Sequence, residues 1–317
     1  FYKYFYFSLT FADISMKKYS LLISILLSIF LITSCCQNSE FIRPELSEPT
    51  PAASFYADNL SVDSSDKLSV HFIDVGQADC ALLLCGGESM LIDGGNAADS
   101  SLLFSYLKKL NVTSIDYMIC SHAHEDHVGG LSAPLSTMEV KNVFAHKKES
   151  TSKAYNNFKT KAAEQGLEII NPQSGDTISF GGCTVEFFVP AGLGSSNMNN
   201  TSIICKVTFG NTSFLFTGDA EREEEQNIIE QGCNLRADVL KVGHHGSETS
   251  TSYVFLREVM PKYSVISVGK KNSYGHPSEA VLSRLSDEGS EVFRTDLNGD
   301  IIMESNGTNI SITTQKN

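Results

Sequence analysis

Four side chains that can bind metal ions stand within six residues of one another: His122, His124, Asp126 and His127. Imidazole and carboxylate groups are ligands for Zn²⁺, Mn²⁺ and iron. Six of the eight histidines of the chain lie in this segment or in two later ones, whereas core histidines would be scattered. We therefore interpret the cluster as metal-binding. A pair of ions about 3.5–4 Å apart would activate a water molecule for hydrolysis.

The elements around this segment must bring it to the edge of a sheet. It directly follows a predicted buried strand, Ile115–Cys120, and precedes Gly129-Gly130. From Leu68 onward, short apolar runs alternate with helical patterns. We expect strands at 68–75, 80–84, 90–92, 115–120, in four runs within 177–218, and at 239–242 and 264–268, and helices at 102–110, 152–165, 220–231, 253–259 and 278–285. This order favours one α/β or α+β layered domain over residues 68–317.

The charge balance argues against unaided binding of nucleic acid. Lys and Arg number 24 against 37 Asp and Glu, a net charge of −13, so no basic face is expected. Bound metal ions can still supply positive charge locally. The modest basic clusters are 147–148, Lys153 and 270–271. The apolar share of 41% excludes wholesale disorder.

The N-terminal region has the pattern of an export signal. We interpret residues 1–15 as upstream read-through, 16–34 as a lipoprotein signal peptide and 35–67 as a disordered tether. The apolar run Leu21–Ile32 would rise only about 18 Å as a helix, against roughly 30 Å for a membrane core. The alternative is a buried apolar helix. Because Ile32–Cys35 resembles the lipobox of bacterial lipoproteins, we expect a lipid on Cys35 and anchoring to the cell surface.

The segment His122–His127 resembles the signature of the metallo-β-lactamase superfamily. Three further motifs agree with it: Leu91–Gly95, Phe214–Asp219 and Lys241–Ser247. The resemblance implies an αββα sandwich, in which two mixed β-sheets of four to seven strands each pack face to face with helices on both outer faces. The active site would lie along one sheet edge.

Several motifs resemble one branch, the metallo-hydrolase domain of the ComEC competence proteins. The opening of that domain is similar to Phe72–Asp79. The later motifs are Asn199–Ser202, His244–Ser247, Tyr274–Pro277 and Arg294–Asp296. The resemblance covers residues 68 to 304 and implies a phosphodiester substrate, with DNA as the candidate.

The resemblance implies two divalent metal ions, Zn or Mn, and it assigns their ligands to the positions of this chain that match the family motifs. Metal one would be held by His122, His124 and Asp219. Metal two would be held by Asp126, His127, Asp219 and His244, with His245 as the alternative to His244. Asp93 would brace the histidine loop without binding metal.

Catalytic roles fall to Asp126, His127 and His276. His276 and Ser247 could contact the substrate phosphate, although Gly-His-Pro is equally a turn.

One part of the superfamily pattern is missing. The third metal motif is a histidine shortly before the Gly-Asp strand, and Asn199 and Asn200 occupy that stretch. Metal one would then have three protein ligands, or an asparagine would orient a water molecule. We interpret His146 as a surface histidine and 221–225 as the solvated start of a helix, since acidic residues stabilise a helix N-terminus.

These observations favour an exported metal-dependent phosphodiesterase or nuclease. A second hypothesis keeps the site but makes the substrate a phosphorylcholine ester or another small phosphoester, which suits the acidic composition. A third is a surface binding lipoprotein without turnover. A β-lactamase is disfavoured because the third-motif histidine is missing. Nothing in the sequence indicates a protein partner.

Overall fold

The computed structural model describes residues 67–190 and 196–316. The expected read-through, signal peptide and tether lie outside the described residues. All described residues belong to one compact unit. Within these two ranges no helix has the length and apolar character needed to cross a bilayer.

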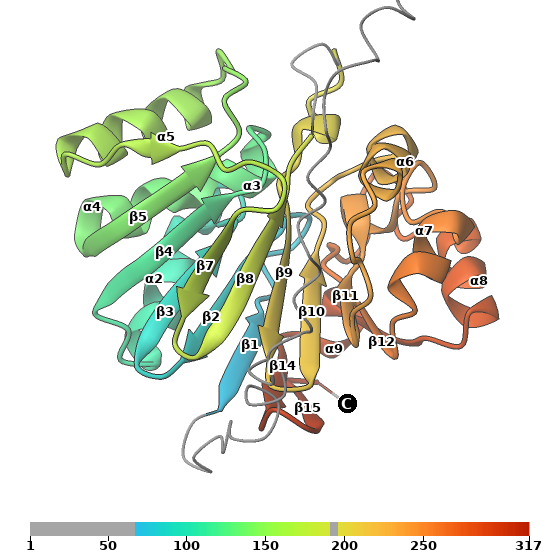
Figure 1. Cartoon of the computed structure of the whole chain (residues 1–317). Coiled ribbons are helices and arrows are strands. Elements are labelled where there is room, and N and C mark those ends of the chain that lie inside the picture. Colours follow the sequence, from blue (N-terminus) through green and yellow to red (C-terminus); the bar gives the residue numbers. More distant parts are fainter. Residues whose placement is uncertain (1–66, 191–195, 317) are drawn as a thin grey trace, which may run out of the picture. The chain divides into compact units, whose positions relative to one another are not determined.

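Two mixed β-sheets pack face to face (Figure 1). The first sheet has eight strands, in the order β15 (Ile310–Thr314), β14 (Ile301–Ser305), β1 (Leu68–Phe72), β2 (Ala81–Cys85), β3 (Glu88–Ile92), β4 (Ser114–Cys120), β5 (Glu139–Ala145) and β6 (Ile169–Ile170). The second has seven, in the order β13 (Glu291–Arg294), β12 (Tyr263–Ile266), β11 (Val239–Lys241), β10 (Thr212–Phe216), β9 (Ile204–Phe209), β8 (Cys183–Phe188) and β7 (Thr177–Phe180).

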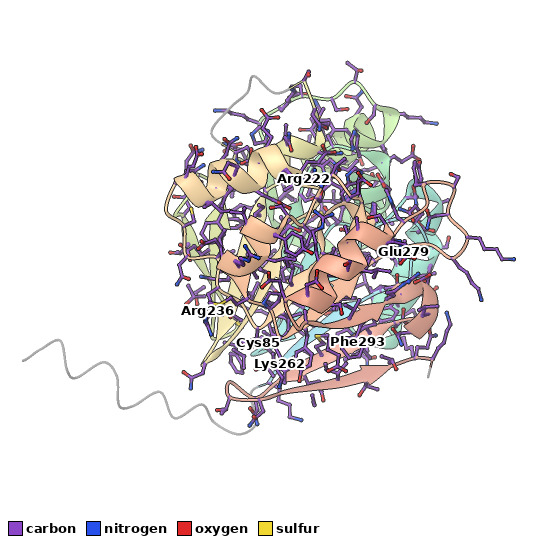
Figure 2. All side chains as sticks on the ribbon, turned by 90° about the vertical axis from the view of Figure 1, so that its right-hand side faces the viewer. Cys85, Arg222, Arg236, Lys262, Glu279 and Phe293 are labelled. Atoms are coloured by element: carbon purple, nitrogen blue, oxygen red, sulfur yellow. The ribbon has the colours of Figure 1, made fainter. Side chains whose placement is uncertain are left out.

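Helices cover the outer face of each sheet, which completes the expected αββα sandwich. The helices are α2 (Ser100–Lys109), α3 (Glu125–Val128), α4 (Ser132–Thr137), α5 (Lys153–Glu164), α6 (Arg222–Glu230), α7 (Tyr253–Val259), α8 (Glu279–Asp287) and α9 (Thr295–Asn298). Apolar side chains of α2, α4 and α5 pack on the eight-stranded sheet, and those of α6, α7 and α8 on the other. Figure 2 looks onto this second layer, with Arg222 at the start of α6 and Glu279 at the start of α8.

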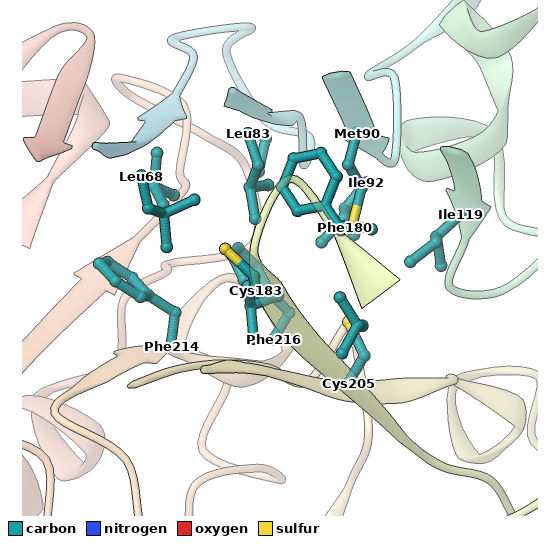
Figure 3. Close-up of a cluster of buried hydrophobic side chains, with 14 of the residues drawn as sticks. Leu68, Leu83, Met90, Ile92, Ile119, Phe180, Cys183, Cys205, Phe214 and Phe216 are labelled. Carbon is teal, nitrogen blue, oxygen red and sulfur yellow. The ribbon is translucent and has the colours of Figure 1, made fainter. Parts of the chain in front are cut away.

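The alternation of side chains along the strands explains the main core. In β1, Leu68, Val70 and Phe72 point between the sheets, while Ser69 and His71 point to the outer face. The facing strands supply Phe214 and Phe216 of β10 (Figure 3). Phe72 stacks on Phe216 with ring centroids 5.9 Å apart. Each such side chain contributes about 1.5–3 kcal/mol of burial energy, so the two sheets are held firmly against each other.

Serine side chains fix the starts of three helices. Ser152 accepts a hydrogen bond from Tyr155 N at the start of α5, and Ser252 accepts one from Phe255 N at the start of α7. Ser278 caps α8 in the same way. These caps satisfy backbone N–H groups that have no partner inside the helix.

The expected fold class is confirmed, with one correction to the strand count. The expectation of at most seven strands per sheet is wrong for the first sheet, which has eight. No strand was expected at β5, where exposed Glu139 and Lys141 interrupt the apolar pattern at the start of the strand. The C-terminal hairpin of β14 and β15 extends the other end of this sheet, beside β1.

Candidate metal centre

The candidate ligands all follow the carboxyl ends of neighbouring strands. The segment His122–His127 follows β4 of the eight-stranded sheet, Asp219 follows β10, and His244 and His245 follow β11 of the seven-stranded sheet. β10 and β11 are parallel, so their carboxyl ends meet at the same edge. This edge is where α/β sheets place their ligand sites, and the site therefore draws side chains from both sheets.

Asp93 fixes the histidine loop, as the resemblance implied. Its Oδ1 accepts a hydrogen bond from Ser121 N at 2.8 Å, and its Oδ2 accepts one from Ser121 Oγ at 2.7 Å. The same Oδ2 lies 2.8 Å from His127 Nδ1. Because Nδ1 is engaged in this way, Nε2 of His127 is presented towards Asp219.

Two glycines allow the loops of the site to approach one another. Gly218 has φ of +50°, and a Cβ atom there would lie 2.9 Å from the side chains of Ser121 and Ser202. A Cβ atom on Gly130 would lie 2.0 Å from the carbonyl oxygen of Gly94. Any larger residue at either position would push apart the loops that carry the candidate ligands.

Asp219 lies at the centre of the site and faces both groups of ligands. Its Oδ1 is 3.2 Å from Nε2 of His127 and 3.9 Å from Nε2 of His245. Its Oδ2 is 3.8 Å from Nε2 of His122 and 3.8 Å from Nε2 of His244. Each oxygen thus faces a different pair of histidines, so Asp219 would be shared by the two groups of candidate ligands.

The two adjacent histidines after β11 point to different sides of Asp219. His245 groups with Asp126, His127 and Asp219, and its Nε2 is 3.1 Å from Asp126 Oδ2. His244 instead faces Oδ2 of Asp219, on the side of His122. His245 therefore groups with the other candidate ligands of metal two, which is the alternative that the sequence left open beside His244.

An unusual backbone produces this split. His244 and His245 have φ of 50° and 52°, and Gly246 follows with φ of 81°. Non-glycine residues in this left-handed region cost of order 1–3 kcal/mol each and concentrate at functional sites. The successive left-handed residues turn the two imidazoles to opposite sides of one carboxylate.

Each of the two adjacent histidines, His244 and His245, has an acidic partner behind it. Nδ1 of His245 lies 3.0 Å from the carbonyl oxygen of Ser267 and 3.2 Å from Asp79 Oδ1. Nδ1 of His244 lies 3.3 Å from Glu221 Oε1. Such partners orient a ligating imidazole and raise its basicity. Both histidines therefore present Nε2 to the site.

Asn199 and Asn200, which stand where the superfamily has its third-motif histidine, both form hydrogen bonds with Glu221. Asn199 Nδ2 donates to Glu221 Oε1 at 2.8 Å, and Asn200 Oδ1 accepts from Glu221 N at 3.1 Å. Glu221 is held on both its side chain and its backbone. The stretch that lacks the expected histidine thus positions the carboxylate behind His244.

The electrostatics of the site separate the two groups of histidines. Burial lowers the pKa of His122 well below its ordinary value, so its imidazole is neutral and able to bind a cation. Burial also opposes protonation of His245, but Asp219 and Asp79 outweigh it and raise the pKa to about 10. Asp219 and Asp93 likewise raise the pKa of His127. A divalent cation at metal two would displace these protons.

Unpaired buried atoms show that the donor set fits a cation. His127 Nε2 and Asp219 Oδ1 are buried and form no hydrogen bond with any described residue, although they lie 3.2 Å apart. Orphaned buried polar atoms are costly. Two imidazole and two carboxylate ligands at metal two, and His122 and His124 beside Asp219 at metal one, are a donor set suited to zinc or manganese.

A cleft of about 320 Å³ opens over the candidate ligands. His276, one of the expected substrate contacts, lines it together with Tyr274 and Gln77. The ring of His276 lies 5.8 Å from that of His244. Burial lowers the pKa of His276, and His244 and His245 lower it further, so the imidazole is neutral at pH 7.

Three expectations from the sequence are wrong. The hydroxyl of Ser247 lies 3.0 Å from Thr249 Oγ1 and is not part of the cleft lining. His146 is buried rather than at the surface, and it lines a different cavity beside Lys147. Within 221–225, the helix start is not fully solvated, because Glu224 and Glu225 are buried against the layer of helices.

Sequence reasoning also missed the partners behind the ligands. Lys241 Nζ lies 2.7 Å from Asp79 Oδ2, and both side chains are buried. Glu221 was assigned to the helix start alone. A signal was available, since Lys241 ends a buried strand and a buried lysine needs an acidic partner.

Comparison with known proteins identifies the family. Residues 73–270 match the model of the Metallo-beta-lactamase superfamily, and the chain belongs to that superfamily. Together with the donor set above, this makes it a metal-dependent hydrolase.

The similar curated proteins are competence and recombination proteins. The chain is 31% identical over 255 residues to ComE operon protein 3 of Bacillus subtilis, covering 75% of this chain and 33% of that protein. It is 32% identical over 228 residues to Competence protein ComA of Neisseria gonorrhoeae, covering 71% and 30%. The chain thus spans about a third of the length of these relatives.

Among solved structures, the metallo-beta-lactamase fold protein YhfI from Bacillus subtilis is similar, with a TM-score of 0.50 at 16% identity. The match covers 76% of this chain and all of that one. At this identity the likeness supports the fold alone.

Proposed function

We propose that the chain is an exported, lipid-anchored phosphodiesterase that cleaves DNA with two Zn or Mn ions. The observation that carries the hydrolytic part is the position of Asp219, whose two oxygens face separate histidine pairs at the floor of an open cleft. The similarity to competence proteins supports a nucleic-acid substrate. Export and the lipid on Cys35 rest on the sequence pattern of residues 16–35.

The ligands divide into two sets around Asp219. His122, His124 and His244 would hold metal one with Asp219 Oδ2, and Asp126, His127 and His245 would hold metal two with Oδ1. His244 would then take the place of the missing third-motif histidine.

When bound, two such ions lower the pKa of a water molecule to near neutrality and stabilise the charge of a phosphate transition state.

The protein side chains prepare this chemistry in three ways. Asp93, Asp79 and Glu221 hold Nδ1 of their histidines, which fixes each ring in place. Asp126 and His127 would supply ligands from one short helix, α3. His276 is neutral and lines the cleft, so one of its ring nitrogens carries an N–H group that can donate a hydrogen bond to a phosphate oxygen.

The test incubates the purified chain with Mn²⁺ or Zn²⁺ and single-stranded DNA, beside an Asp126→Asn variant. We expect cleavage by the wild type and its loss, by at least about a hundredfold, in the variant. Glu279→Gln, the same carboxylate-to-amide change on the outer helix α8, is the control and should cleave normally.

Absence of cleavage by a chain that measurably binds metal would overturn the nuclease proposal. Hydrolysis of a phosphorylcholine ester by that chain would favour the second candidate, which the net charge of −13 supports. For the anchor, a Cys35→Ser variant should lose the lipid mass and leave the membrane fraction of cells. If the Cys35→Ser variant stays in the membrane fraction, the proposed lipid anchor on Cys35 is contradicted.

A further inference from the structure

Tyr274 is a solvent-exposed aromatic side chain in the lining of the cleft. It is 70% exposed, the most exposed large hydrophobic side chain in the part of the chain that the structure describes. Large rings are normally at least half buried because exposure of their apolar surface is unfavourable. Its ring nevertheless stands in the lining of the metal cleft rather than on an outer helix.

A short series of rings leads from the candidate ligands to Tyr274. The ring of His276 meets that of His244 edge to face, with centroids 5.8 Å apart. On its other side, Tyr274 lies nearly parallel to His276, with centroids also 5.8 Å apart and an angle of 17° between the planes. Tyr274 therefore contacts His276, and His276 contacts His244, which faces Asp219.

The loop that carries Tyr274 is held rigidly by one asparagine. Asn272 Oδ1 accepts hydrogen bonds from the backbone N–H groups of Tyr274 and His276, at 3.1 and 3.0 Å. Its Nδ2 donates to the carbonyl oxygens of Gly269 and His276. Gly269 N in turn donates to Gln77 Oε1 at 3.0 Å, across to another part of the cleft lining. These bonds fix the backbone on both sides of Tyr274, which limits how much of the loop must be ordered when a ligand binds.

The chemistry around this ring favours a nucleobase as its ligand. Every base has a flat π-face that stacks on an exposed aromatic side chain. Lys270 and Lys271 belong to the same loop and can attract backbone phosphates. A quaternary ammonium group is usually bound in a cage of several aromatic rings, and Tyr274 is the single Tyr, Phe or Trp among the described residues that line the cleft.

We propose that Tyr274 is a stacking platform for a base next to the scissile phosphodiester, which makes single-stranded nucleic acid the substrate class of this site. The proposal rests on the proposed phosphodiesterase function and deepens it. His276 backs the platform from the side of the metal ions, and the outer face of Tyr274 receives the base. Tyr274 is a specificity-determining residue, and it takes no part in holding metal.

The test compares Tyr274→Ala with Tyr274→Phe, which keeps the ring but not the hydroxyl group. Tyr253→Ala is the matched control, because Tyr253 is an exposed tyrosine on the outer helix α7. The substrates are a single-stranded DNA oligonucleotide and the same strand with abasic sites. With metal bound, we expect Tyr274→Ala to raise KM for the normal strand roughly tenfold with kcat within about twofold. The Phe and Tyr253 variants should behave as wild type.

A second measurement does not depend on cleavage. In the Asp126→Asn variant, binding of an oligonucleotide with 2-aminopurine should change the fluorescence of that base, and adding Tyr274→Ala should abolish the change. The abasic strand should bind the wild type roughly tenfold more weakly than the normal strand. Circular dichroism of each variant checks that the fold is intact.

The outcomes separate the two proposals. Cleavage with equal KM for wild type and Tyr274→Ala, or for normal and abasic strands, overturns the stacking proposal and leaves the nuclease intact. Fluorescence that depends on Tyr274 without any cleavage supports stacking and contradicts the nuclease. If phosphorylcholine binds in a way that depends on Tyr274 and the oligonucleotide gives no response, the stacking proposal is overturned. Tyr274 would then bind a quaternary ammonium group and not a nucleobase.

Discussion

Lys241 and Asp79 form a buried ion pair directly behind His245. Lys241 Nζ lies 2.7 Å from Asp79 Oδ2, and Asp79 Oδ1 lies 3.2 Å from His245 Nδ1. Burial opposes ionisation of Asp79, but Lys241 and His245 outweigh it and lower its pKa below the ordinary value. The lysine therefore keeps this carboxylate charged, and the carboxylate holds the imidazole.

Removal of Lys241 should be costly, because it leaves a buried carboxylate without its cation. We expect Lys241→Met to lower the free energy of unfolding by about 3–5 kcal/mol, measured by urea denaturation. The double variant Asp79→Asn with Lys241→Met removes both charges and should recover part of that loss. Equal loss in the single and double variants would show that the lysine acts by packing alone.

Glu221 should control the affinity of one ion and not the other. Because its carboxylate lies 3.3 Å from His244 Nδ1, Glu221→Gln should weaken the ion at metal one by about 10–100-fold. Isothermal titration calorimetry with Mn²⁺ should resolve one weakened and one unchanged site. Glu223→Gln is the control, since Glu223 lies in the same turn and, among residues 67–190 and 196–316, its carboxylate bonds to Asn200 and not to a histidine. Two unchanged sites would exclude the role given to Glu221.

The two adjacent histidines should serve different ions. His245→Ala should remove the ion shared with Asp126 and His127, and His244→Ala should weaken the ion shared with His122 and His124. Each variant is expected to retain about one ion per chain where the wild type holds two, as measured by mass spectrometry of the metals. If His244→Ala retains two ions, His244 is not a ligand, and metal one has only the three protein ligands His122, His124 and Asp219.

Glu224 should make the fold less stable as the pH rises. It is 3% exposed, and burial raises its pKa from 4.5 to about 7. The folded chain therefore holds this proton more tightly than the unfolded chain does. The stabilisation is complete below about pH 4.5 and is lost as the pH rises through 7.

The Glu224→Gln variant lacks this titration. Between pH 5 and 8, the wild type should lose up to roughly 3 kcal/mol of unfolding free energy relative to the variant, measured by chemical denaturation at each pH. The exposed Glu230→Gln on the same helix serves as the control. Parallel pH profiles for wild type and Glu224→Gln would contradict the prediction.

The fold was predictable from local patterns where these were regular. Strands such as β2 are continuous apolar runs, and helices such as α5 and α8 begin at a capping serine. β5 was missed because its first residues alternate with exposed charges. The number of strands in a sheet depends on pairing between distant segments, such as β14 with β1, which no local pattern encodes.

The candidate site was predictable in residue type but not in orientation. The sequence indicated every member of the two ligand groups, because histidine and carboxylate spacing is a local feature. Which of His244 and His245 faces which ion depends on two left-handed backbone residues. The partners Asp79 and Glu221 lie far along the chain from some of the groups they support, so only the folded arrangement reveals them.

The origin of the ligands in both sheets has a consequence for how the protein matures. Each ion would be held by two side chains from the segment His122–His127 after β4 and two from the loops after β10 and β11. Neither half of the chain alone offers more than half of a coordination sphere. Tight capture of metal must therefore await the docking of the two halves, and a chain that carries both ions is one whose assembly is already complete.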